Sequence, residues 1–187
     1  MKTVLAAFAR YSLRQTDACD IFPCFSIFIE PKEVNEAIKI LVFSDSHGKS
    51  SHMSNAILKE KPDLLLFMGD GLYDLYRMQT EFALPATGVK GNCDMGVSEQ
   101  TSRTLNIDGM KIYMTHGHIY GVKSGYDTVI DAAKSAGADV LLFGHTHHAV
   151  YEMSGALHVL NPGSIFDGNY GLIEIKDSKP FCRLKSV

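Results

Sequence analysis

The chain has 187 residues, of which 45% are hydrophobic and 21% are charged, and its formal net charge is −3. This length suffices for one globular domain with a sizeable core. The small negative charge argues against a broad basic face for nucleic acid, and no apolar run is long enough to span a bilayer. The four cysteines show neither zinc-knuckle spacing nor a disulfide pattern, which favours reduced thiols in the cytoplasm.

Residues 1–36 differ in pattern from the rest of the chain. Their apolar start is cut short by Arg10 and Arg14, so we expect no signal peptide and a cytoplasmic protein. Pro23 and Pro31 interrupt regular structure, and residues 21–29 suit an edge strand, a docking arm or an unstructured segment. We therefore predict an N-terminal extension of unknown role over residues 1–36 and a main domain over residues 37–187.

Residues 38–89 predict alternating strands and helices. The apolar, β-branched run at 38–43 indicates a buried strand, and Ser50–Ser51 can begin a helix that ends near Glu60. A second buried strand is expected at 64–67, a short helix at 74–80 and a third strand at 86–89. This order is typical of parallel strands joined by helical crossovers.

The second half of the chain has a different pattern of predicted elements, with a hairpin and several short strands. Residues 104–107 and 111–114 flank Asp108–Gly109, which is a strong signal for a two-residue hairpin turn. A helix is expected over 125–137 and a strand over 140–143, followed by short strands at 149–151, 157–160 and 170–175. Two mixed sheets covered by helices satisfy this pattern, so we predict an α/β fold.

Residues of metal-ligand type follow the predicted strands in five groups. The groups are Asp45 with His47, Asp70, Asn92, His116, and His145 with His147. Singly, such residues are ordinary helix caps, turn residues or loop histidines, but an α/β enzyme builds its active site beyond the carboxyl ends of its strands. Hard oxygens mixed with imidazoles suit two divalent ions bridged by a shared carboxylate. The pattern predicts a two-metal hydrolase for phosphate esters.

The same groups carry a family resemblance. The segments Asp45-Ser46-His47, Gly69-Asp70, Gly91-Asn92-Cys93-Asp94, His116-Gly117-His118 and Gly144-His145-Thr146-His147 resemble, in order, the signature blocks of the calcineurin-like metallophosphoesterases. Cys93, the small size and Asn161-Pro162-Gly163-Ser164 resemble the YfcE-type phosphodiesterase branch. The likeness covers about residues 38–177, so that the domain over 37–187 would be a metallophosphoesterase domain. It implies a four-layer α/β/β/α sandwich of two mixed β-sheets flanked by helices.

The resemblance also implies the roles of the site residues. Asp45, His47 and His147 would hold one ion, Asn92, His116 and His145 the other, and Asp70 would bridge both. Two such ions can share a hydroxide that attacks phosphorus in line. We expect Mn²⁺, with Ni²⁺, Fe²⁺, Co²⁺, Zn²⁺ and Mg²⁺ as alternatives, because affinity order does not decide the metal in cells. The expected substrate is a small phosphodiester or phosphomonoester, and a homo-oligomer is left open.

One position departs from the wider superfamily. The third block there often has a histidine that is thought to protonate the leaving group, whereas this chain has Cys93, which is a poor acid at neutral pH. We take His118, the nearest spare imidazole, as the substitute, and place it with Asn92 at the catalytic centre. The alternative function is an interaction scaffold that has lost catalysis, as in the retromer subunit that resembles this family. The complete ligand set favours the enzyme.

Overall fold

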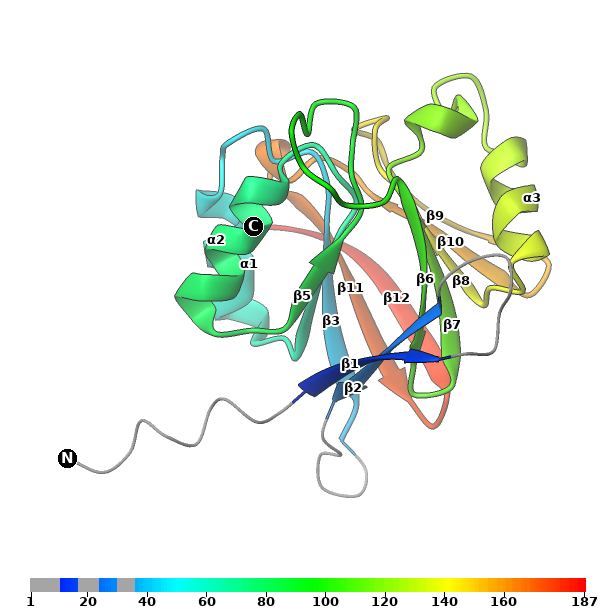
Figure 1. Ribbon diagram of the computed structural model, residues 1–187, viewed down its shortest axis with the longest axis horizontal. Helices are drawn as coiled ribbons and strands as arrows, with labels where there is room; N and C mark the ends of the chain where they lie inside the picture. The colour runs from blue at the N-terminus through cyan, green and yellow to red at the C-terminus, as the bar shows by residue number, and fades with distance from the viewer. Residues whose placement is uncertain (1–10, 17–23, 30–35) are drawn as a thin grey trace.

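The computed structural model describes residues 11–16, 24–29 and 36–187 (Figure 1). For the first two of these segments it describes only the backbone, which forms strands. The strands are β1 (Tyr11–Thr16), β2 (Cys24–Ile29), β3 (Ile38–Phe43), β4 (Leu64–Phe67), β5 (Ala86–Gly88), β6 (Ser102–Ile107), β7 (Met110–Thr115), β8 (Val140–Leu142), β9 (Ala149–Ser154), β10 (Leu157–Pro162), β11 (Asn169–Lys176) and β12 (Lys179–Ser186). The helices are α1 (Ser51–Glu60), α2 (Leu72–Phe82) and α3 (Asp127–Ser135), with 3₁₀ turns η1 (His118–Tyr120) and η2 (Ile165–Asp167).

Two β-sheets pack face to face between helices. One sheet has the order β1-β2-β6-β7-β8-β10-β9 and the other β12-β11-β3-β4-β5, and each mixes parallel and antiparallel pairs. Helices α1 and α2 cover the outer face of the smaller sheet, and α3 covers the outer face of the larger one (Figure 1). The predicted four-layer α/β/β/α sandwich is confirmed.

Three apolar clusters fill the three interfaces of this sandwich. Strand β3 is apolar from residue 40 to residue 43, because both of its faces are buried there. Ile40 and Val42 lie in the cluster between the sheets, whereas Leu41 and Phe43 pack under α1 and α2. The third cluster joins α3 to the larger sheet through residues such as Val129.

Most predicted elements form close to their expected positions. The hairpin turn is Asp108–Gly109 between β6 and β7, and both turn residues have the positive φ that a type I′ turn requires. Strand β12 was not predicted, because Lys179, Arg183 and Lys185 interrupt any apolar run there. It forms because all eight of its residues pair with β11.

Part of the N-terminal region joins the larger sheet. Strand β2 pairs in parallel with β6, and β1 pairs antiparallel with β2. Residues 24–29 therefore form a strand, but not the edge strand that was one alternative, because β1 lies outside β2 at the edge of the sheet. Residues 21–23 and 1–10 lie outside the described segments. The boundary between an extension over 1–36 and a domain over 37–187 stays a prediction.

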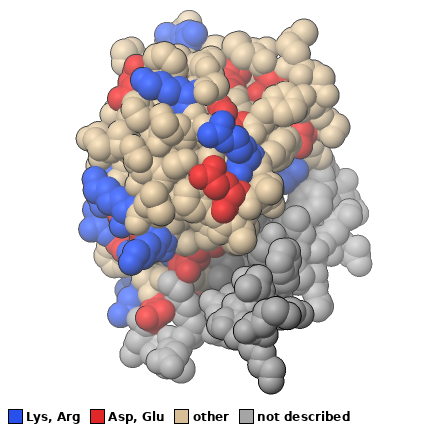
Figure 2. Space-filling view, turned by 90° about the vertical axis from the view of Figure 1, so that its left-hand side faces the viewer, with Lys and Arg blue, Asp and Glu red and all other residues tan. Residues whose placement is uncertain are grey.

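The surface over α1 and α2 mixes charges of both signs. Lysines and arginines lie among aspartates and glutamates on the face shown in Figure 2, without a field of one sign. Within the described part of the chain, no helix is long and apolar enough to cross a membrane.

Candidate metal centre

The five sequence groups meet at one edge of the sandwich. Strands β3, β4 and β5 run parallel in one sheet and β7 and β8 run parallel in the other, so the segments that follow them emerge together (Figure 1). Backbone hydrogen bonds then join these segments: Asp45 N donates to Gly69 O at 2.9 Å, and Gly144 N donates to His116 O at 3.1 Å. The structure thus brings together residues up to about a hundred positions apart in sequence.

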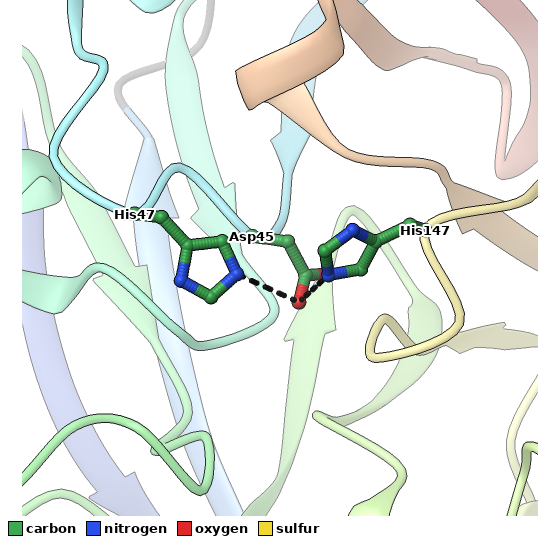
Figure 3. Close-up of side chains that lie close together, drawn as sticks. All are labelled: Asp45, His47 and His147. Carbon is green, nitrogen blue, oxygen red and sulfur yellow. Dashed lines mark ion pairs between the residues drawn. The ribbon is translucent and has the colours of Figure 1, made fainter.

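Asp45, His47 and His147 form the first group of donor atoms. Figure 3 shows both imidazoles turned toward the Asp45 carboxylate. Nε2 of His147 lies 3.2 Å from Oδ1 of Asp45, and Nε2 of His47 lies 4.0 Å from the same oxygen. These spacings suit three ligands that surround a single cation, since the three ligand atoms lie within 4.8 Å of one another.

The Asp45 carboxylate shows that this group fits a cation. Its Oδ2 accepts hydrogen bonds from the Ser44 hydroxyl and from the His145 N–H. Its Oδ1 is buried and accepts no hydrogen bond from any described residue. A buried carboxylate oxygen without a partner is costly, and a divalent ion would satisfy it.

Asp70, Asn92, His116 and His145 form the second group. Nε2 of His116 lies 3.4 Å from Oδ2 of Asp70, 3.2 Å from Oδ1 of Asn92 and 3.1 Å from Nδ1 of His145. Four donor atoms of different chemistry therefore converge around one point. Asp70 also belongs to a set with His47 and Cys93 whose ligand atoms lie within 4.8 Å of one another, so it stands between the two groups.

The tautomer of His116 is set by the backbone. Its Nδ1 lies 2.7 Å from the carbonyl oxygen of Met68, which can only accept a hydrogen bond. The proton of a neutral ring therefore sits on Nδ1, and the lone pair of Nε2 points toward the other donors. This arrangement is typical of metal-binding histidines.

The pKa values in the second group diverge. Burial alone would raise the pKa of Asp70, but the hydrogen bond and charge of His116 and the N–H of Cys93 hold it well below its usual range. Burial alone would lower the pKa of His116, yet Asp70 and Asp45 raise it. Burial, the charge of His116 and that of Lys123 lower the pKa of His145 to about 4. His145 is therefore a neutral imidazole at pH 7, as a ligand must be.

Five of the seven donor residues have a left-handed backbone. The φ angles are 55° for Asp45, 45° for His47, 62° for Asp70, 68° for His145 and 61° for His147. Residues other than glycine avoid this region, although Asp and His tolerate it better than most. Such strain gathers at functional sites, where the surrounding structure holds it in place.

Asp94 joins the loop that follows β4 to the loop that follows β5. Its buried carboxylate accepts four backbone hydrogen bonds: Oδ2 from Asp70 N at 2.7 Å and Gly91 N at 2.9 Å, and Oδ1 from Gly71 N at 2.8 Å and Leu72 N at 3.0 Å. Two of these donors are at the start of α2, where free N–H groups favour an anion. Sequence reasoning missed this role, although Asp94 ends the third signature block.

Two further polar residues hold the outer loops. Asp74 accepts hydrogen bonds from the Ser46 hydroxyl at 2.6 Å and from Gly48 N at 2.9 Å, which fixes the segment around His47. Asn161 donates to Gly144 O at 2.9 Å and to the Thr146 hydroxyl at 3.0 Å, which fixes the segment around His145. Of these two residues only Asn161 was singled out from the sequence, as part of the segment that resembles the YfcE-type branch.

Glycines permit the close approach of the loops. Gly69 has a φ of 98°, and a Cβ there would lie 2.6 Å from the backbone nitrogen of Gly91 and 2.9 Å from Nδ1 of His116. Any larger residue would therefore push two of the ligand-bearing segments apart.

His118 and Cys93 border the second group. The His118 ring lies 5.4 Å from the His116 ring and 6.1 Å from the His145 ring, and its buried Nδ1 has no hydrogen-bond partner among described residues. Burial and the charge of His116 lower the pKa of His118. Burial and Asp70 raise the pKa of Cys93, so this residue is a thiol at neutral pH.

Two histidines outside the signature blocks have structural partners. Nδ1 of His52 lies 3.0 Å from the carbonyl oxygen of Ile165, and Nδ1 of His158 lies 2.9 Å from the Tyr151 hydroxyl. Neither belongs to a ligand group within the described residues. These contacts are those of packing or surface histidines.

Comparison with known proteins identifies the class. The model of the calcineurin-like phosphoesterase superfamily domain matches residues 38–177. The probable metallophosphoesterase YsnB of Bacillus subtilis is 34% identical over 130 residues, which cover 68% of this chain and 75% of that protein. The chain belongs to the calcineurin-like phosphoesterase superfamily.

Two further relatives extend this likeness. The phosphodiesterase YfcE of Escherichia coli is 30% identical over 93 residues, which cover 46% of this chain and 47% of that protein. A crystal structure of Vps29 from Entamoeba histolytica complexed with Zn²⁺ has a TM-score of 0.64 at 20% identity, and the match covers 79% of this chain and 98% of that one. The latter likeness shows the shared fold alone.

Proposed function

We propose that this protein is a dinuclear metal-dependent phosphodiesterase. The observation that carries the proposal is the buried Asp45 Oδ1, which accepts no hydrogen bond from the described residues and faces two imidazoles. Membership of the superfamily and the resemblance to YfcE support a phosphoester substrate. A small phosphodiester is preferred over a monoester because the chain is similar to the phosphodiesterase YfcE. Cys93 in place of the third-block histidine favours leaving groups that need little protonation.

The seven donor residues would hold two divalent ions. Asp45, His47 and His147 would bind one ion, and Asn92, His116 and His145 the other, with Asp70 between them. When bound, such ions lower the pKa of water and neutralise charge on phosphoryl oxygens. The mixed oxygen and nitrogen donors suit Mn²⁺, and Ni²⁺, Fe²⁺, Co²⁺, Zn²⁺ and Mg²⁺ are the alternatives.

The surrounding residues would orient this chemistry. The Met68 carbonyl holds the His116 ring so that Nε2 faces the site, and Asp94 holds the backbone of Asp70. Such outer contacts fix the direction of ligands and keep the site open in a single geometry.

His118 would handle the leaving-group proton. Its lowered pKa favours the neutral ring at pH 7, so proton donation requires the charge of a bound phosphate to raise that pKa. The thiol of Cys93 is a weaker candidate because its pKa is raised. The free thiols of Cys93 and Cys182 also suit the reducing cytoplasm, which is part of the same proposal.

The test is hydrolysis by metal-stripped protein to which Mn²⁺, Ni²⁺, Mg²⁺ or Zn²⁺ is restored in turn. We expect cleavage of bis(4-nitrophenyl) phosphate to exceed that of 4-nitrophenyl phosphate, and to be lost again with chelator. An interaction scaffold is the second function, supported by the fold shared with Vps29. Two bound ions per chain without turnover of either ester would favour the scaffold and reject the enzyme.

A further inference from the structure

Large apolar side chains are exposed beside the donor residues. Tyr73 is 67% exposed and comes three residues after Asp70, and Met95 is 80% exposed and comes three residues after Asn92. Ile119 is 53% exposed and comes three residues after His116. The fourth is Phe166, which follows no donor in sequence. We call Tyr73, Met95, Ile119 and Phe166 the apolar rim.

Phe166 is joined to the site through space. Its N–H donates to the carbonyl oxygen of Asp45 at 3.3 Å, and the neighbouring Ile165 N–H donates to Ser44 O at 2.9 Å. Nζ of Lys49 lies 4.6 Å from the centre of the Phe166 ring and donates to the Phe166 carbonyl. The ring is therefore held beside the loop that carries Asp45 and His47, with a cation next to it.

Backbone contacts at Met95 and next to Tyr73 also involve the site. Leu72, next to Tyr73, donates its N–H to the Asp94 carboxylate that binds Asp70 N. Met95 N donates to Cys93 O at 3.0 Å, and Cys93 N in turn donates to Asp70 Oδ1 at 2.7 Å. The backbone that carries Tyr73 and Met95 is thus tied to the donor residues.

Exposed apolar residues indicate a ligand-binding site when they surround a polar functional centre. Single ones are ordinary, but an apolar surface continuous with a functional centre marks a place where a ligand binds. Binding sites commonly combine a few polar groups that fix orientation with apolar walls that bind the rest of the ligand. Here the donor residues supply the polar part and the rim supplies the apolar part.

We propose that the apolar rim binds an aromatic or similarly apolar group that stays on the phosphate of the substrate after the leaving group departs. This inference rests on the proposed phosphodiesterase function and narrows its substrate class. A diester that carries a small alkyl group would occupy the metal centre but leave the rim in water. A diester with an aryl group in place of that alkyl group would cover rim side chains and bind more tightly.

Two esters with the same leaving group test this inference. Bis(4-nitrophenyl) phosphate and methyl 4-nitrophenyl phosphate both release 4-nitrophenolate, but only the first keeps an aryl group on phosphorus. We would measure kcat and KM for both with the full-length Mn²⁺-loaded protein and with Met95→Ser and Phe166→Ser. The matched controls are Met153→Ser on β9 and Phe181→Ser on β12, which are exposed and lie outside the rim.

The expected result is a selective loss. Each rim variant should lower kcat/KM for the aryl diester about 5- to 10-fold, mainly through KM, and the methyl ester by less than about twofold. The control variants should match the wild type with both esters. An equal loss with both esters, or no loss in either rim variant, would overturn the inference while leaving the phosphodiesterase proposal intact.

A binding measurement separates the inference from the proposed function. If the wild type cleaves neither ester with any metal, the phosphodiesterase proposal fails, and calorimetry with phenyl phosphate and inorganic phosphate tests the rim alone. Tighter binding of phenyl phosphate that Met95→Ser removes would support the rim as an aryl site. Equal affinity for the two ligands would overturn it and leave this face for a macromolecular partner.

Discussion

Asp94 offers the sharpest test of how the loops are held. In Asp94→Asn the side-chain amide keeps one oxygen, which can accept two of the four backbone hydrogen bonds. The other two N–H groups would then face an NH₂ group, which accepts nothing. Because the carboxylate is buried, water cannot replace the lost partner.

The size of the effect follows from these contacts. A hydrogen bond to a charged group contributes about 1.5–3 kcal/mol, so losing two of them should cost about 4 kcal/mol of the free energy of unfolding. For a chain of this length that corresponds to a fall in Tm of about 8–16 °C. Asp70 N is one of the four donors, so the affinity for Mn²⁺ should also fall about tenfold.

Thermal denaturation followed by circular dichroism, with and without Mn²⁺, measures both effects. The matched control is Asp139→Asn. The exposed carboxylate of Asp139 accepts one hydrogen bond from the described residues, from Lys111 N at 2.8 Å, and lies far from the metal-donor residues. Its Tm should stay within about 4 °C of the wild type. An Asp94→Asn protein as stable as this control, with unchanged Mn²⁺ affinity, would refute the role that we assign to Asp94.

Four other outcomes are expected. Asp70→Asn removes the charge between the two donor groups, so bound metal should fall below two ions per chain and turnover should drop at least about a hundredfold; near-normal turnover would reject the bridging role. His118→Ala should slow diesters with alkyl leaving groups about a hundredfold more than 4-nitrophenyl diesters, and an equal effect on both would remove His118 as the acid. Because Asp70 raises the pKa of His116, a proton occupies this histidine at mildly acidic pH and must leave when metal binds. Metal affinity should therefore rise from pH 5 to pH 8 with release of a proton, which calorimetry in buffers of different ionisation enthalpy would detect; a pH-independent affinity would contradict this. Deletion of residues 1–36 leaves β6 as the edge strand and should preserve activity, whereas an insoluble product would show that β1 and β2 belong to the fold.

The metal-free stability has a matching pH dependence. The raised pKa of His116 stabilises the fold below about pH 6.5, and this contribution is lost as pH rises through the folded-state pKa. The lowered pKa of Asp70 stabilises the fold above about pH 4, and this contribution is lost as pH falls further. The pair therefore contributes most between these two values.

The sequence predicts the parts of the fold that depend on burial pattern. Strands β3 and β4 are apolar on both faces, so their composition alone indicates them. Strand β12 has no such pattern, because it lies at the edge of its sheet and its stability comes from hairpin pairing with β11. The pairing of β2 with β6 leaves no local signal, because the two strands lie far apart in sequence.

The candidate site divides in a similar way. The order of the donor residues after strands predicts that they converge, because parallel strands end at the same edge of a sheet. The anchoring by Asp94 was not predicted, since an aspartate that binds four backbone N–H groups looks in sequence like any loop aspartate. The apolar rim was equally hidden, because exposure depends on the packing of loops that sequence patterns do not describe.

The left-handed donors connect the site to the stability of the whole chain. Five such residues, at about 1 kcal/mol each, store about 5 kcal/mol of backbone strain, which is comparable with the net stability of a typical domain. The carboxylate of Asp94 and the close packing at Gly69 hold part of this strain in the metal-free chain. A separate cost arises from donor atoms that have no hydrogen-bond partner among the described residues, such as Oδ1 of Asp45. Ions that bind these atoms would favour the folded chain by mass action, so the strained backbone makes metal binding and folding one coupled equilibrium.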